Sequence, residues 1–182
     1  MRGACGACGS VTLTYVNNIL QKYPRILAIA PSTRGFGYAV LEGDKMLVDW
    51  GVKSVKGDKN TGSIQEVGKM ISHYEPHVMV LEDTAHKESR RSARIQALTK
   101  SVIVLAEGRS IKVALFSQKQ VRRVFLGDGC GTKHALAEII AERFPEELGF
   151  RLPPKRRAWT SEDSRMDIFD AVALALMLRD GR

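Results

Sequence analysis

Residues 25–42 constrain the fold of this 182-residue chain more than any other stretch. They read RILAIAPSTRGFGYAVLE, in which two apolar runs flank a break at residues 31–35. Two strand-like runs around a short glycine-containing turn predict a β-hairpin. The first run has too few polar positions for a half-exposed strand, so we expect it to lie centrally in a sheet that is covered on both faces. At its end lies Ala30, where a site could form, although Ala30 carries no functional group.

The rest of the chain carries further strand and helix patterns. Short apolar runs predict strands at residues 45–54, 77–81 and 111–116. Apolar residues spaced three and four apart predict helices, and Ser63 with Glu66 forms a capping-box pair at the start of the first. The predicted helices span residues 63–74, 89–107, 117–126, 132–144 and 166–178. The proline-rich and basic segment 150–165 predicts an extended loop.

Length and charge narrow the class of protein. The length suits one domain, which we expect over residues 25–182, with residues 1–24 as an N-terminal extension. The formal net charge of +8 makes a polyanion the first partner to test. No apolar run approaches the roughly 20 residues that span a bilayer, and the N-terminus lacks a positively charged region followed by an apolar one. We therefore expect a cytoplasmic protein with no membrane partner.

The three cysteines are too few for a disulfide framework. Cys5 and Cys8 form a single CxxC, and the simplest interpretation is a leader with two free thiols. The alternative is a structural zinc site, which needs four ligands, so Cys130 and His134 would have to supply the other two.

Basic residues gather in three places, each of which is either a solvated face or a contact for nucleic-acid phosphates. The first follows Glu82 at the start of the second predicted helix, and the second is the third predicted helix. The third is the proline-rich loop, where Trp159 could add base stacking. The candidate nucleic-acid-binding residues are Lys87, Arg90, Arg91, Arg94, Lys119, Arg122, Arg123, Lys155, Arg156 and Arg157.

A glycine-rich stretch, GDGCG at residues 127–131, precedes the fourth predicted helix. The GxxxxGK[ST] pattern of a P-loop is absent, so we interpret the stretch as a plain turn. Lys133, just after it, is its one functional candidate.

Three carboxylates suggest a cation site. Asp167 and Asp170 are three residues apart, so they project from one face of the last predicted helix. Two like charges near the start of an otherwise apolar helix are unfavourable unless a cation or a cap offsets them. A cap at Ser164 together with the helix dipole explains Asp167 better than Asp170. With Glu82 at the end of a predicted strand, the pattern instead predicts oxygen ligands for a hard divalent cation such as Mg²⁺.

Over residues 25–179 the chain resembles the RuvC-type Holliday junction resolvases of the RNase H-like superfamily. The motifs that carry the resemblance are, in order, ILAIAPSTRGFGYAV, EPHVMVLED, FSQKQVRRVFLGDGCGTKHAL and MDIFDAVALAL. Each motif has modest specificity, but all four occur in the family's order with compatible spacing. The resemblance implies an RNase H-like α/β fold, in which the antiparallel hairpin leads a mixed sheet with helices on both faces.

The resemblance also implies a site. In the family, four carboxylates hold two metal ions that cleave a phosphodiester bond. Glu82 would match the strand carboxylate, and Asp167 and Asp170 the helix pair. Lys133 would match the lysine near the scissile phosphate. The family's first-strand aspartate falls at Ala30, whose methyl group cannot bind a cation, and the aromatic residue that follows the strand carboxylate has no counterpart. Family members act as dimers, so the resemblance also implies a homodimer.

Three hypotheses for the function follow. The first is a Mg²⁺-dependent or Mn²⁺-dependent endonuclease on branched or structured DNA, with the three carboxylates as ligands and Lys133 at the phosphate. The second is a DNA-binding relative that has lost cleavage and uses no metal, prompted by Ala30. The third is a protein-interaction scaffold, since fold does not imply function. Ser32 and Asp83 are the nearest residues that could replace the missing ligand.

Overall fold

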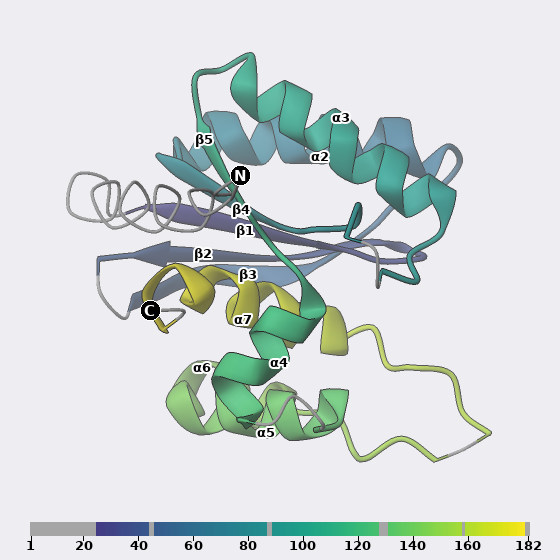
Figure 1. Cartoon of the computed structure of the whole chain (residues 1–182), viewed down its shortest axis with the longest axis vertical. Helices are drawn as coiled ribbons and strands as arrows, with labels where there is room; N and C mark the ends of the chain where they lie inside the picture. The colour runs from purple at the N-terminus through teal and green to yellow at the C-terminus, as the bar shows by residue number, and fades with distance from the viewer. Residues whose placement is uncertain (1–24, 44–45, 87–88, 128–130, 158, 181–182) are drawn as a thin grey trace, which may run out of the picture.

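The computed structural model describes residues 25–43, 46–86, 89–127, 131–157 and 159–180. Within them, five strands form one mixed sheet in the order β3-β2-β1-β4-β5 (Figure 1). β1, β2 and β3 pair antiparallel, whereas β4 and β5 continue the sheet parallel to β1. The predicted mixed sheet, led by an antiparallel hairpin, is confirmed. The strands are β1 (Ile26–Pro31), β2 (Gly35–Glu42), β3 (Met46–Ser54), β4 (Val78–Glu82) and β5 (Lys112–Phe116).

Some predictions fall outside the described residues. These are the zinc ligands Cys5, Cys8 and Cys130, the N-terminal extension, and the candidate DNA contact Lys87.

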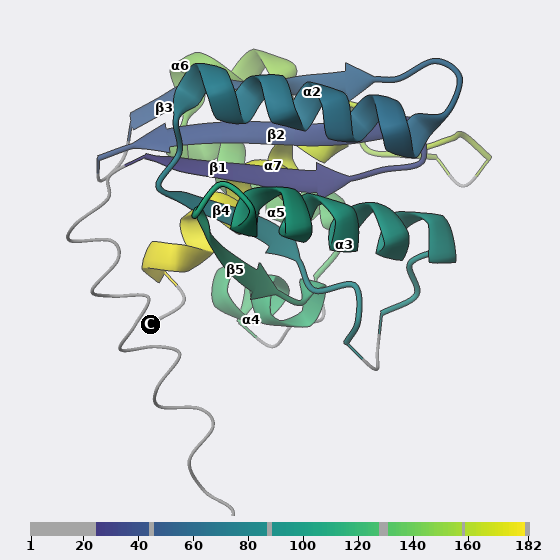
Figure 2. The ribbon, with the colours of Figure 1, turned by 90° about the horizontal axis from the view of Figure 1, so that it is seen from above.

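The helices form layers on both faces of the sheet (Figures 1 and 2). α2 (Lys59–Tyr74) and α3 (Ala93–Glu107) cover one face, and α7 (Met166–Asp180) packs on the other, against β1 and β2. α4 (Gln118–Leu126) and α5 (Lys133–Arg143) pack against α7, with α6 (Pro145–Leu148) and η1 (Gly149–Arg151) beside α5. No helix in these ranges is both long enough and apolar enough to cross a membrane.

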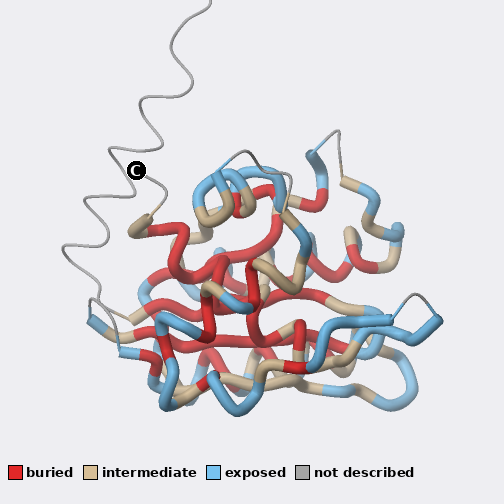
Figure 3. The backbone as a smooth tube through the Cα atoms, turned by 90° about the horizontal axis from the view of Figure 1, so that it is seen from below, coloured by how far each residue is buried: buried red, intermediate tan, exposed pale blue. Residues whose placement is uncertain are grey.

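β1 is buried along its whole length, as its apolar sequence predicts. Because successive side chains of a strand point to opposite faces, Leu27 and Ile29 pack into the core beneath α2 and α3. Ala28 and Ala30 pack into the core around α7. Figure 3 shows buried backbone running through the middle of the molecule, with exposed backbone around it.

The start of α7 sits directly on the sheet. Gly37 of β2 is the register partner of Ala30 in β1. A Cβ atom on Gly37 would lie 2.0 Å from the backbone oxygen of Asp167. Only a residue without a side chain allows this approach, so Gly37 sets the position of Asp167 above the end of β1.

The first helix begins earlier than predicted. Asp58 caps α2, since its carboxylate accepts hydrogen bonds from the backbone NH of Asn60 and from the hydroxyl of Thr61. The predicted cap Ser63 is therefore buried inside the helix. The Ser-x-x-Glu pattern at residues 63–66 was wrong as a start signal because the helix already begins after Asp58.

α3 begins later than predicted. The hydroxyl of Ser92 accepts a hydrogen bond from the backbone NH of Ile95 and caps the helix there. Residues 89–91 therefore belong to the connection between β4 and α3. This position lets Arg90 and Arg91 turn toward the end of β4.

Candidate functional site

The predicted catalytic residues meet at one edge of the sheet. β1, β4 and β5 are parallel, so their C-terminal ends lie together (Figure 2). Glu82 is the last residue of β4 and Lys133 the first of α5, whereas Asp167 and Asp170 lie in the first turns of α7. Glu82, Lys133 and Asp170 line one small cavity of about 30 Å³.

Lys133 lies within 4.0 Å of both aspartates of the helix pair. Its Nζ lies 2.8 Å from Oδ2 of Asp170 and 4.0 Å from Oδ1 of Asp167. It also lies 2.8 Å from Oε1 of Glu162. Burial alone lowers the pKa of Lys133, but the charge and hydrogen bond of Asp170, with those of Glu162, outweigh it and raise that pKa. The ammonium group therefore stays charged among three carboxylates.

The two aspartates differ in how they are held. Burial raises the pKa of Asp170, and the charge and hydrogen bond of Lys133 act against it. Burial also raises the pKa of Asp167 to about 6, while the nearby Ser32 hydroxyl and the charge of Lys133 act in the opposite direction.

Arg91 neutralises Glu82. Nε of Arg91 lies 2.9 Å from Oε1 and 3.0 Å from Oε2 of Glu82, and Nη2 lies 2.5 Å from Oε2. This fork geometry occupies both carboxylate oxygens. Burial lowers the pKa of Arg91, but the hydrogen bonds and charge of Glu82 outweigh it and raise that pKa. Because Glu82 is only 5% exposed, Arg91 is the main compensation for its buried charge.

The residues near the missing aspartate do not replace it. Ala30 is 2% exposed and offers a methyl group. The Ser32 hydroxyl is buried near Asp167, whose pKa it acts to lower, but it is a neutral group and does not supply the missing charge. Asp83 follows the end of β4, and its Oδ1 accepts a hydrogen bond from the backbone NH of Ala85. Asp83 lines a second, larger cavity and is not among the residues of the small cavity that holds Asp170.

The donor set does not fit a divalent cation in this arrangement. Mg²⁺ prefers free carboxylate oxygens at about 2.1 Å with near-octahedral geometry. Here Arg91 holds Glu82, Lys133 holds Asp170, and Ala30 supplies no oxygen. Across the described ranges, no group of three or more His, Cys, Asp or Glu side chains could hold a metal ion. The predicted metal role of the three carboxylates therefore stays a prediction, which would require displacement of two ion pairs.

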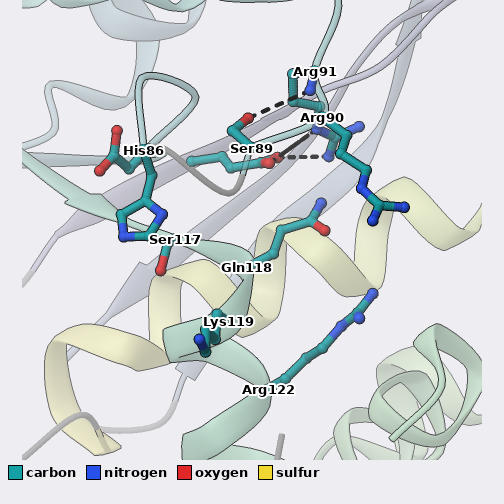
Figure 4. Close-up of a pocket in the computed structure, with 10 residues that line it drawn as sticks. His86, Ser89, Arg90, Arg91, Ser117, Gln118, Lys119 and Arg122 are labelled. Atoms are coloured by element: carbon teal, nitrogen blue, oxygen red, sulfur yellow. Dashed lines mark hydrogen bonds and ion pairs between the residues drawn. The ribbon is translucent and has the colours of Figure 1, made fainter. Parts of the chain in front are cut away.

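A basic cavity opens beside Glu82. Its volume is about 590 Å³, and it lies between the β4–α3 connection and the start of α4. In Figure 4, Arg90 and Arg122 extend toward the same open space from the two sides. The cavity has more cationic than anionic side chains, and one of its carboxylates is neutralised by Arg91. The charged residues that line it are Glu82, Asp83, His86, Arg90, Arg91, Lys119 and Arg122.

Other predicted DNA contacts lie elsewhere. Arg94 donates to the backbone oxygen of Ser32 at 2.8 Å and to Oδ1 of Asn60 at 3.1 Å, so it ties α3 to the end of β1 and to α2. Arg123 is exposed on α4 and does not line the basic cavity.

The loop before α7 also reaches the site. Lys155 and Arg156 line a cavity of about 230 Å³ together with Lys133 and Glu162, and Arg157 is exposed nearby. Sequence reasoning missed Glu162, because an acidic residue in a basic loop has no periodic relation to Lys133.

His134 is already engaged in this structure. Its Nε2 lies 3.0 Å from the backbone oxygen of Pro153, and its Nδ1 lies 3.3 Å from Oε1 of Glu138. Both ring nitrogens therefore have partners, which disfavours His134 as a zinc ligand.

Comparison with known proteins agrees with this geometry. The family model "Crossover junction endodeoxyribonuclease RuvC" matches residues 26–145. A protein of that name from Akkermansia muciniphila is 29% identical over 125 residues, which cover 64% of this chain and 75% of the relative. The protein of the same name from Hydrogenovibrio crunogenus is 28% identical over 131 residues, covering 66% of this chain and 75% of the relative.

Solved structures share the fold. Thermus thermophilus RuvC in complex with a Holliday junction substrate superposes with a TM-score of 0.62 at 16% identity, covering 85% of this chain and 92% of that one. The yeast mitochondrial Holliday junction resolvase Ydc2 gives a TM-score of 0.55 at 16% identity, covering 92% of this chain and 85% of that one. The predicted RNase H-like α/β fold is thereby confirmed. Since the family model spans most of the chain, from the first strand to the start of α6, this protein belongs to the RuvC family.

Proposed function

We propose that this protein binds branched DNA, such as a four-way junction, and does so without the two-metal cleavage of RuvC nucleases. DNA binding is supported by membership of the family, by the net charge of +8 and by the basic cavity at the sheet edge. A relative of this fold has been solved on a Holliday junction substrate. Arg90, Lys119 and Arg122 line the cavity and would contact phosphates, which dominate the affinity of such complexes.

The ion pairs of the site support the absence of two-metal cleavage. Two of the three predicted metal-binding carboxylates form close ion pairs within the chain, Glu82 with Arg91 and Asp170 with Lys133. Metal-assisted phosphodiester cleavage needs carboxylates that can hold ions against the attacking and leaving oxygens. With a methyl group at Ala30 as well, two of the three predicted metal-binding carboxylates are already paired with cations of the chain, and Lys133 lies 4.0 Å from the third, Asp167.

The test separates binding from cleavage. We would measure the affinity for a labelled four-way junction by fluorescence anisotropy, in EDTA and in Mg²⁺ or Mn²⁺, and look for nicks on denaturing gels. The expected result is binding of similar affinity in all three conditions, without nicks. Metal-dependent nicking that Asp167→Asn abolishes would refute the proposal. Failure to bind any DNA or RNA at low salt would instead favour a protein-interaction scaffold.

Variants of the basic cavity test whether it contacts the DNA. Arg90→Ala with Arg122→Ala should weaken binding and lower the slope of log affinity against log salt by about 2, close to 1 for each lost phosphate contact. Lys100→Ala removes one exposed charge from the middle of α3 and should change neither quantity. If Lys100→Ala alone has half the effect of the double change, only the overall charge matters.

A second candidate is the metal-dependent endonuclease. It is favoured by the presence of Glu82 and Asp170 in one cavity with Lys133, the arrangement that the family resemblance predicts. The nicking assay above decides between the two candidates.

A homodimer is also part of our proposal, and light scattering on a sizing column tests it. A mass of two chains is expected, and a mass of one chain would contradict it.

A further inference from the structure

A strap, which we define as residues 152–157 and 159–165, leads from η1 to the start of α7. It runs out from the end of the molecule where β1 and β4 finish, and returns there (Figures 1 and 2). Both of its limbs are attached to α5. On the outgoing limb, the backbone oxygen of buried Pro153 lies 3.0 Å from Nε2 of His134. On the returning limb, Glu162 forms an ion pair with Lys133 at 2.8 Å.

Hydrogen bonds join Arg156 and Arg157 to Thr160 near the tip of the strap. The backbone NH and the hydroxyl of Thr160 both donate to the backbone oxygen of Arg157, at 3.1 and 3.0 Å. Nε of Arg156 donates to the backbone oxygen of Thr160 at 2.6 Å. Trp159 directly precedes Thr160, the residue that makes these bonds.

Trp159 is 81% exposed, more than any other large hydrophobic residue in the described part of the chain. No ring or cation from the described residues stacks on its indole. Phe150, at 66% exposure, differs because the guanidinium of Arg151 lies over its ring at 5.0 Å. The face of the Trp159 indole is therefore available to stack on a partner.

The charges beside Trp159 indicate what the partner is. Lys155 and Arg157 are exposed on the same strap. An aromatic ring flanked by cations is suited to a nucleic-acid strand, since any base stacks on an aromatic face while the cations contact neighbouring phosphates. An apolar protein groove would not need these cations next to the ring.

We infer that Trp159 stacks on an unpaired or unstacked base of the DNA, and that Lys155 and Arg157 hold the flanking phosphates. This inference rests on the proposed DNA binding and names the part of the DNA that Trp159 contacts, an exposed base. The strap is anchored to Lys133 and His134 at the start of α5, and Lys133 lines the small cavity together with Glu82. The predicted substrate is therefore DNA with exposed bases, at a branch point or in a single strand.

The chain offers a sharp test because it contains only two tryptophans. Trp50, the other one, lies half-buried on β3 against the core. A Trp50→Phe variant leaves Trp159 as the only indole, and a Trp159→Phe variant leaves Trp50. Titration with a labelled junction, and with a single-stranded oligonucleotide, gives indole fluorescence and anisotropy together.

We expect the fluorescence of the Trp50→Phe variant to be quenched in step with binding, and that of the Trp159→Phe variant to stay constant. Trp159→Ala should weaken binding about 5-fold to 150-fold, the range for loss of one stacked base, and Trp159→Phe much less. Binding without quenching and with unchanged affinity of Trp159→Ala would overturn the inference and leave the proposed function standing. Absence of binding by anisotropy in the unaltered protein would overturn both.

Discussion

Replacement of Arg91 by alanine should destabilise the protein through Glu82. The Glu82 carboxylate is buried and makes contacts of 2.5, 2.9 and 3.0 Å to this one guanidinium. Removal of one partner of a buried ion pair costs about 3–5 kcal/mol, because the other charge stays behind. The Arg91 side chain is 24% exposed, so water can partly replace it and we expect a loss of about 3 kcal/mol. For a chain of this length, that loss lowers the melting temperature by about 6–12 °C.

The assay is urea unfolding followed by circular dichroism at pH 7. The neighbouring change Arg90→Ala, at an exposed position, is the control and should alter the free energy of unfolding by less than about 0.5 kcal/mol. The double variant Glu82→Leu with Arg91→Met removes both charges and should recover most of the loss. If Arg91→Ala is as stable as Arg90→Ala, or if the double variant recovers nothing, Arg91 does not compensate the charge of Glu82.

Three further predictions concern the start of α7. Because burial raises the pKa of Asp167 to about 6, the folded protein keeps a proton between about pH 4 and pH 6 that the unfolded chain releases. The free energy of unfolding should therefore fall as the pH rises through this window, and this fall should be smaller in the Asp167→Asn variant. Urea unfolding at several pH values measures both. Gly37→Ala should lower the free energy of unfolding by more than about 3 kcal/mol, since its Cβ would lie 2.0 Å from the backbone oxygen of Asp167. The control Gly149→Ala places a Cβ with nothing within 4 Å and should leave this free energy nearly unchanged. Lys133→Ala should lower the free energy of unfolding by about 3 kcal/mol, because it leaves Asp170 without its cation. Asp170→Asn added to Lys133→Ala should recover most of that loss in the same unfolding assay.

Much of the fold follows from local pattern. The apolar run of β1, the turn and the resumption in β2 predict a hairpin, because strand and turn preferences act over a few residues. The nearly continuous apolar sequence after Asp167 likewise predicts a buried helix. The helix starts were less predictable, because Asp58 and Ser92 compete with other capping residues nearby, and the sequence alone does not rank them.

The composition of the site was predictable, but its charge pairing was not. Glu82, Asp167 and Asp170 stand out because carboxylates are rare in apolar elements. Arg91 was predicted as a phosphate contact on a helix, yet it precedes α3 and turns back onto Glu82. The ion pair between Glu162 and Lys133 depends on how the strap folds over α5. Such pairs follow from tertiary structure, and no periodicity in the sequence encodes them.

The most direct test of the central claim, that cations of the chain take the place of bound metal, is a calorimetric titration with Mn²⁺ and Mg²⁺. We predict no saturable binding at millimolar metal in the unaltered protein, and junction affinity that does not change in EDTA. A variant with Ala30→Asp and Arg91→Ala supplies the missing oxygen ligand and frees Glu82, so it should gain saturable binding. Stoichiometric metal binding by the unaltered protein that Asp170→Asn abolishes would contradict the account.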